Sequence, residues 1–106
     1  MTKIKICGLK DRPTIEAAVL AGATYLGFVF AKSPRQMMPD EVRRLTRDLP
    51  ERIKTVGVFV SPQQNEIEKI ADIAGVDLVQ IHGQTNLTTL SRPILSAFSV
   101  KEQKHV

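Results

Sequence analysis

The chain has 106 residues, 42% of them hydrophobic and 25% charged, with a net charge of +4. These values are typical of one globular domain, which we place over residues 1–106. The single cysteine excludes an internal disulfide, and no apolar run reaches the ~20 residues that a membrane span needs. We therefore expect a cytoplasmic protein without a membrane partner. One tyrosine and no tryptophan leave few rings to stack on bases, so we expect no nucleic-acid partner.

The first predicted element is a short strand over residues 3–7, which Gly8 ends. Successive side chains of a strand point to opposite faces, so Lys5 and Cys7 share one face and the isoleucines occupy the other. If the isoleucines lie under helices, the lysine and the thiol point into whatever the sheet encloses. A lone cysteine and a Lys/Ile alternation are also typical of an inert thiol on an edge strand. This stretch alone leaves both interpretations open.

Strands and helices are predicted to alternate along the rest of the chain, from the apolar periodicity and from capping and stop residues. The helices are expected from Asp11 to Gly22, over 40–48, from the Ser61-Pro62-Gln63-Gln64 capping box to Gly75, and over 85–91. The further strands are expected over 25–30, 53–60, 77–81 and 94–98. Residues 100–106 have the pattern of the start of a helix.

The alternation predicts an α/β fold with a parallel sheet and right-handed crossovers. Residues 21–26 align with residues 74–79, each after a helix with the same apolar spacing. Repeated units of this kind build a (β/α)8 barrel. A five-stranded doubly wound sheet fits 106 residues better than a whole barrel does, so at this point both architectures stand.

Polar side chains are predicted at the carboxyl ends of the strands, where parallel α/β folds bind ligands. Cys7 ends the first strand and Arg35 and His82 follow two others, while Lys5 and Gln80 share the inward parity of their strands. Guanidinium binds a carboxylate or phosphate through two hydrogen bonds, and buried polar groups need partners. A plain surface turn at Arg35 and a packing role for His82 are the alternatives.

The sequence contains no pattern typical of a metal site or of a nucleotide-binding site. One cysteine and two histidines have no ligand spacing, and no nucleotide-binding glycine motif is present. We therefore expect neither a metal nor a cofactor.

Four stretches, in order and at a matching spacing, resemble the phosphoribosylanthranilate isomerase family of tryptophan biosynthesis. They are residues 5–9 (KICGL), 27–30 (GFVF) with 33–35 (SPR), 56–60 (VGVFV) and 79–83 (VQIHG). The resemblance implies a (β/α)8 TIM barrel and an isomerase of the aldose–ketose type. Its reaction is an Amadori rearrangement of a small phosphorylated substrate, made during aromatic amino-acid biosynthesis.

The resemblance also implies roles for single residues. Cys7 takes the position of the family's general base, and Arg35 that of the arginine that holds the anthranilate carboxylate. Lys5, Gln80 and His82 are expected to line the substrate pocket. An ammonium on the same strand face as the thiol favours the thiolate, so such a base works near neutral pH.

The family's general acid is an aspartate after the sixth strand, and its phosphate-binding loops follow strands seven and eight; nothing in these 106 residues matches them. We therefore expect an incomplete barrel of about four βα units plus a fifth strand. The isolated chain is expected to be inactive, and to associate with itself or with a C-terminal half-barrel. The alternative is a non-catalytic half-barrel or flavodoxin-like module that acts by association with another chain.

Overall fold

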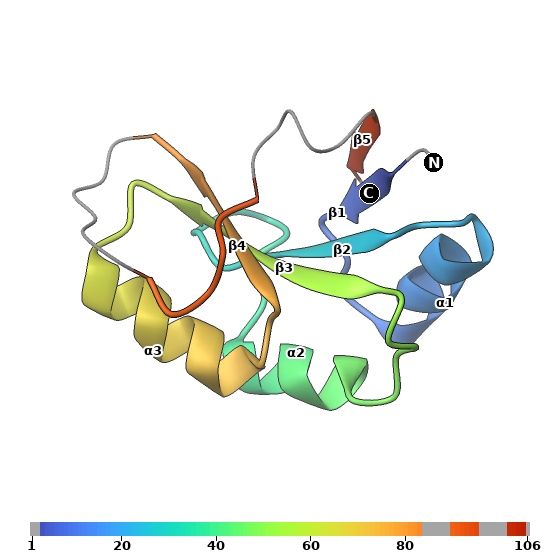
Figure 1. Cartoon of the computed structure of the whole chain (residues 1–106), viewed down its shortest axis with the longest axis horizontal. Coiled ribbons are helices and arrows are strands. Elements are labelled where there is room, and N and C mark those ends of the chain that lie inside the picture. The colour runs from blue at the N-terminus through green and yellow to red at the C-terminus, as the bar shows by residue number, and fades with distance from the viewer. Residues whose placement is uncertain (1–2, 84–89, 96–101, 106) are drawn as a thin grey trace.

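Five parallel strands form one sheet, in the order β4-β3-β2-β1-β5 (Figure 1). The computed structural model describes residues 3–83, 90–95 and 102–105, with only the backbone for the last range. The strands are β1 (Ile4–Cys7), β2 (Tyr25–Val29), β3 (Lys54–Val60), β4 (Leu78–His82) and β5 (Glu102–His105). The helices between them are α1 (Arg12–Leu20), α2 (Pro39–Thr46) and α3 (Gln64–Ala74).

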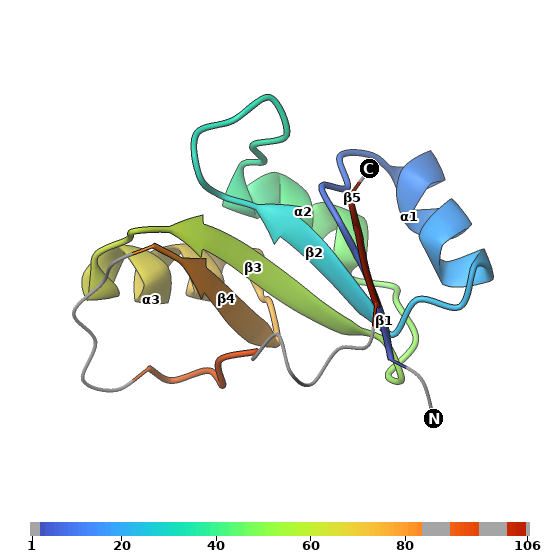
Figure 2. The same cartoon turned by 90° about the horizontal axis from the view of Figure 1, so that it is seen from above.

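All three helices cover the same face of the sheet (Figures 1 and 2). Strands β1 to β4 are neighbours in chain order, so each crossover advances by one strand in the same direction. Right-handed crossovers in one direction place every helix on one side. A doubly wound sheet reverses its strand order and carries helices on both faces. The doubly wound, flavodoxin-like alternative is therefore not the architecture of this sheet, and the predicted incomplete barrel is confirmed.

The sheet separates two apolar layers of different size. The larger layer joins the helices to the outward strand residues, including Ile6, Leu26, Phe28 and Val79. The smaller one lies on the opposite, inner face and contains Cys7, Tyr25, Val56, Val58 and Leu95. The predicted alternation of β1 is thus confirmed, because its isoleucines face the helices and Cys7 faces inward. Lys5 and Cys7 are both buried there, at 1% and 2% exposure.

Local sequence explains where the helices begin and end. Asp11 caps α1, since its carboxylate accepts a hydrogen bond from the backbone N of Thr14 at 3.0 Å. The capping box of α3 is formed by Gln63 and Glu66, and Gly75 ends the helix in the left-handed conformation. The predicted start at Ser61 is wrong. Ser61 instead donates its backbone N–H to the carbonyl of His82 at 2.7 Å and so continues the β3–β4 pairing.

The C-terminal segment differs from its prediction. Glu102–His105 forms a strand where the start of a helix was expected, and it pairs in parallel with β1 from Ile4 to Cys7. Residues with good helix propensity adopt the extended form here because an open strand edge offers partners for their backbone groups. The remaining residues of that expected helix, 100, 101 and 106, lie outside the described part.

The expected fifth strand over 94–98 is present only as a parallel bridge between Ile94 and Val79. Its two hydrogen bonds run from Val79 N to Pro93 O at 3.0 Å and from Leu95 N to Val79 O at 2.8 Å. Residues 96–98 lie outside the described part, as does most of the expected helix over 85–91; Leu90 and Ser91, which are described, are not helical.

Among the helices that the structure describes, α3 is the longest, with 11 residues. Within the described ranges no helix is long and apolar enough to cross a membrane.

Candidate active site

A buried cation lies on the inner face of the sheet. Lys5 on β1 donates a hydrogen bond from Nζ to Oε1 of Gln80 on β4, and the two side chains are 1% and 6% exposed. These strands are three positions apart in the sheet, which in a flat sheet is about 14 Å. The contact therefore requires the sheet to curl towards its inner face. A concave wall of this kind accounts for the contact between these two polar groups.

Cys7 is the last residue of β1 and lies beside Lys5. Burial lowers the pKa of Lys5 below its ordinary value of 10.5, while attraction to Cys7 and a hydrogen bond with its side chain oppose that shift. The sulfur of Cys7 therefore lies within hydrogen-bonding reach of the Lys5 side chain. The predicted pairing of thiol and lysine on one strand face is thus present.

Gly27 makes the room that this pair needs. A Cβ atom at Gly27 would lie 2.9 Å from Sγ of Cys7 and 3.1 Å from Cε of Lys5. Gly27 belongs to the GFVF stretch of the sequence, from which no role was predicted for it. The sequence does contain a signal for this role, because a glycine inside an apolar strand marks a close approach of other groups.

His82 extends the polar chain towards solvent. It is the last residue of β4 and exposed, and its Nε2 lies 3.4 Å from Nε2 of Gln80. The structure therefore links four of the predicted site residues in one line, in the order Cys7, Lys5, Gln80 and His82.

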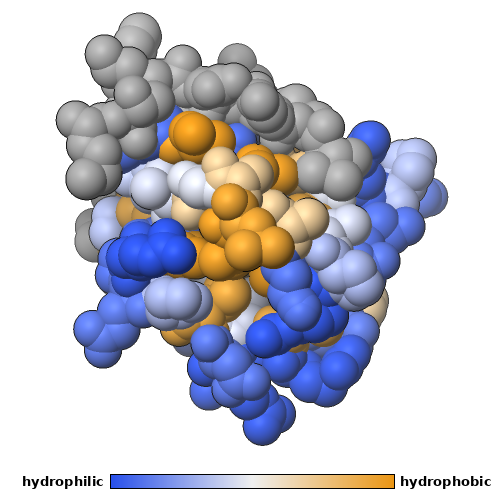
Figure 3. Space-filling model, turned by 90° about the vertical axis from the view of Figure 1, so that its right-hand side faces the viewer, coloured by the Kyte–Doolittle hydropathy of each residue, from blue (hydrophilic) through white to orange (hydrophobic). Residues whose placement is uncertain are grey.

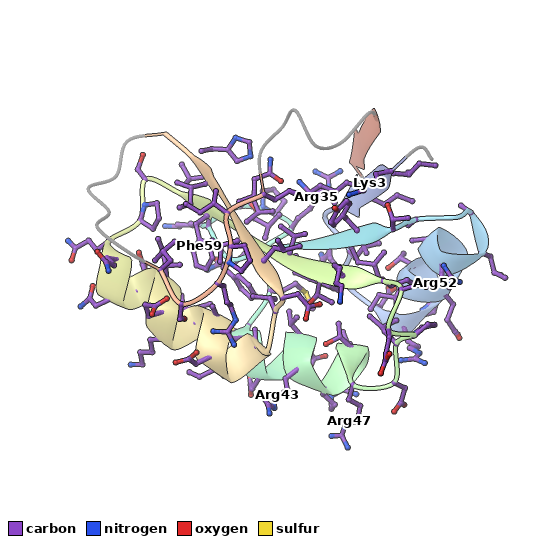
Figure 4. The ribbon with its side chains drawn as sticks, viewed as in Figure 1. Lys3, Arg35, Arg43, Arg47, Arg52 and Phe59 are labelled. Atoms are coloured by element: carbon purple, nitrogen blue, oxygen red, sulfur yellow. The ribbon has the colours of Figure 1, made fainter. Side chains whose placement is uncertain are left out.

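Arg35 lies on the loop between β2 and α2. It is exposed, and its backbone N donates to Oγ of Ser33 at 3.2 Å. The loop after β1 touches the same segment, since Nζ of Lys10 donates to the carbonyl of Pro34 at 3.3 Å. Figure 4 shows Arg35 on the opposite side of the sheet from Arg43 and Arg47, which lie along α2.

A concave wall of parallel strands, with helices outside and polar groups inside near the strand ends, defines part of a (β/α)8-barrel enzyme. The family model described as N-(5'-phosphoribosyl)anthranilate (PRA) isomerase matches residues 4–106. By this match the chain belongs to the phosphoribosylanthranilate isomerase family, as the four sequence stretches indicated.

Relatives and solved structures agree with this assignment. The isomerase of Streptococcus gordonii is 44% identical over 104 residues, which are 95% of this chain and 53% of the relative. That of Streptococcus pneumoniae is 52% identical over 84 residues, 79% of this chain and 42% of the relative. The crystal structure of the Thermotoga maritima enzyme has a TM-score of 0.75 at 36% identity, covering 79% of this chain and 42% of that one.

A further isomerase structure is a complex with reduced 1-(o-carboxyphenylamino)-1-deoxyribulose 5-phosphate. It also has a TM-score of 0.75 at 36% identity, over 79% of this chain and 44% of that one. The chain spans about half the length of the curated relatives it matches.

Replacing Gly27 with alanine tests the close approach of Lys5 and Cys7. We expect the free energy of unfolding to fall by about 1–3 kcal/mol in urea denaturation, because the new methyl group overpacks the inner face. The matched control is Gly57→Ala on β3, where a Cβ would lie 2.9 Å from Cε2 of Phe30 on the helix side. Both variants lose stability, but only Gly27→Ala changes the titration of the Cys7 thiol. A Gly27→Ala chain as stable as the parent contradicts this packing.

Because Lys5 is buried, the free energy of unfolding of the chain should change with pH in the alkaline range. Its folded-state pKa lies below the unfolded value of 10.5, so between the two values the unfolded state binds more protons. The contribution of Lys5 to the free energy of unfolding therefore rises with pH through that window, and below it the cost of burying the ammonium is constant.

The measurement is made with Cys7→Ala as the parent, so that the thiol does not titrate in the same range. We expect this chain to gain stability relative to Cys7→Ala/Lys5→Met as the pH approaches 10.5. Urea denaturation at several pH values gives the difference. Two parallel stability curves would show that Lys5 is not held in a desolvated site.

Proposed function

We propose that this chain supplies the general base and the carboxylate-binding arginine for the Amadori rearrangement of N-(5-phosphoribosyl)anthranilate. The observation that carries the proposal is the buried thiol of Cys7 at the end of β1, beside the ammonium of Lys5. The substrate is an N-linked ribosyl aldosylamine. An acid opens its furanose ring to a Schiff base, and a base then takes the proton from C2′. The resulting enolamine becomes the 1-deoxyketose.

The surroundings of Cys7 suit the second of these steps. The thiolate accepts the C2′ proton, and the electron pair of the broken C–H bond moves towards the protonated Schiff-base nitrogen. Lys5 stabilises the thiolate before the transfer, and burial keeps water from competing for the same proton. Proton transfer to a positioned side chain of this kind contributes about 10²–10⁴-fold to the rate.

Arg35 is proposed to hold the carboxylate of the anthranilate ring. Its loop follows β2 and is tied to the loop after β1 through the Lys10–Pro34 hydrogen bond. Guanidinium keeps its charge at every working pH and binds a planar carboxylate through two parallel hydrogen bonds. The proposed roles of Lys5, Gln80 and His82 are to line the pocket between this arginine and the base.

The family resemblance places the acid and the phosphate-binding loops on strands six to eight, so we propose that a complementary C-terminal half-barrel supplies them, with self-association as the alternative. Exposed apolar groups support such a contact. Val60 at the end of β3 is 57% exposed and Ile94 beside β4 is 53% exposed. A hollow of about 200 Å³ lies between β1 and α1, lined by Ile6, Thr14, Ala17 and Ala18. Figure 3 shows hydrophobic residues gathered on that side of the molecule.

Turnover with a Cys7 variant tests the proposed base. The chain is mixed with a separately expressed C-terminal half of a relative, and conversion of phosphoribosylanthranilate is followed. We expect turnover in the mixture and a loss of about 100-fold or more with Cys7→Ala, because a positioned base contributes about 10²–10⁴-fold. Equal turnover by both chains would exclude Cys7 as the base. No turnover in any mixture would favour the non-catalytic half-barrel.

A conservative change at Arg35 tests the carboxylate contact. Arg35→Lys keeps the charge but loses the planar fork, so we expect KM in the same mixture to rise about tenfold with a smaller effect on kcat. Arg44→Lys is the matched control, since Arg44 is an exposed arginine of α2 that pairs with Glu41 at 2.7 Å. A rise in KM of the same size for both variants would assign the effect to general electrostatics instead of carboxylate binding.

A further inference from the structure

We infer that Gln80 is a positioning residue that holds the ammonium of Lys5 against Cys7, and that His82 fixes the orientation of the Gln80 amide. This inference rests on the proposed role of Cys7 as base. It assigns Gln80 a function that does not require contact with the substrate.

The directions of the hydrogen bonds follow from the chemistry of the ammonium. A charged lysine has three donors and no acceptor, so the amide atom that faces Lys5 has to be the oxygen, Oε1. The amide nitrogen of Gln80 then points the other way, towards Nε2 of His82 at 3.4 Å. Because that nitrogen donates, Nε2 of His82 has to accept. The geometry therefore assigns His82 a neutral ring with its proton on Nδ1.

Gln80 supports the charge on Lys5 without adding a second one. Neither the ion pair Arg44–Glu41 nor the ion pair Arg92–Asp72 includes Lys5. A carboxylate in place of Gln80 would hold the ammonium more strongly, but it would also repel a thiolate nearby. A neutral amide oxygen accepts from the ammonium and leaves Cys7 as the group that gains from its charge. This accounts for an amide at a site that has to generate a thiolate.

Protonation of His82 would break the line of contacts. Two donors would then face each other, and the amide of Gln80 would have to rotate and turn its NH₂ group towards Lys5. Among the described side chains, the titratable neighbours on this face include Lys3, whose Nζ lies 5.8 Å from the centre of the Tyr25 ring, and Tyr25 itself on β2; the backbone of His105 on β5 is the register partner of Cys7. The hydrogen bond of Lys5 goes to Gln80, whereas the Tyr25 ring contacts Lys3, which only donates.

The titration of Cys7 in the absence of substrate tests this inference. Cys7 is the only cysteine of the chain, so the ultraviolet absorbance of thiolate belongs to it alone, after correction for the single tyrosine. Gln80→Met keeps the shape of the side chain and removes the acceptor. Lys5 then loses its charge more readily, and we expect the midpoint of the thiol titration to move upward by about one pH unit.

Thr55→Val is the matched control. Thr55 is also a buried polar residue, 5% exposed, and it loses a hydrogen bond to Asp77 on the other face of the sheet. We expect this variant to leave the midpoint of Cys7 in place. His82→Phe keeps a ring and removes the acceptor for the amide, and should shift the midpoint in the same direction as Gln80→Met but by less.

A midpoint that is the same in Gln80→Met and in the parent chain would overturn the inference. If Gln80→Met does not fold, the inference is tested on the parent chain instead. Nitrogen-15 NMR near neutral pH then shows which ring nitrogen of His82 carries the proton. A proton on Nδ1 of His82 supports the assignment, and a proton on Nε2 overturns it. Neither measurement involves turnover. If Cys7→Ala retained full activity, the proposed base would fail while the link between Gln80 and the thiol titration would stand.

Discussion

The contact between Lys5 and Gln80 is the constraint on which the rest of the inner face depends. A buried ammonium needs acceptors, and here they come from Cys7 on the same strand and from an amide three strands away. The sheet has to be concave for this to happen, and Gly27 has to lack a side chain. Curvature, packing and charge are therefore set together, and each of them keeps the thiol beside a cation.

Much of the fold follows from local patterns in the sequence. The alternation in β1, the cap at Asp11 and the stop at Gly75 are short-range signals that tertiary contacts reinforce. The wrong predictions concern segments whose conformation is set by pairing with strands elsewhere in the chain. Ser61 looks like a helix cap but continues a β-ladder, and Glu102–His105 has no strand pattern of its own. An unpaired edge of β1 gives that segment its conformation, and no local pattern reports an edge.

The candidate site divides in the same way. Strand parity places Lys5, Cys7, Gln80 and His82 on one face, because side chains of a strand alternate strictly. Parity does not reveal that residues 75 positions apart in the chain touch, since this depends on the curvature of the whole sheet. The steric role of Gly27 also stayed hidden, because it requires knowing which side chains cross in front of it. The roles of Cys7 and Arg35 come from family resemblance, which geometry alone does not supply.

The division of the apolar residues into two layers has an evolutionary consequence. Most of the buried hydrophobic residues belong to the helix side, and only a small cluster accompanies the polar residues of the inner face. Substitutions on the inner face can therefore explore new reactions while the helix side continues to specify the fold. The sheet acts as a partition between what selection must conserve for folding and what it is free to vary for chemistry. Gly27 is an exception on the inner face, because any side chain there would collide with Lys5 and Cys7.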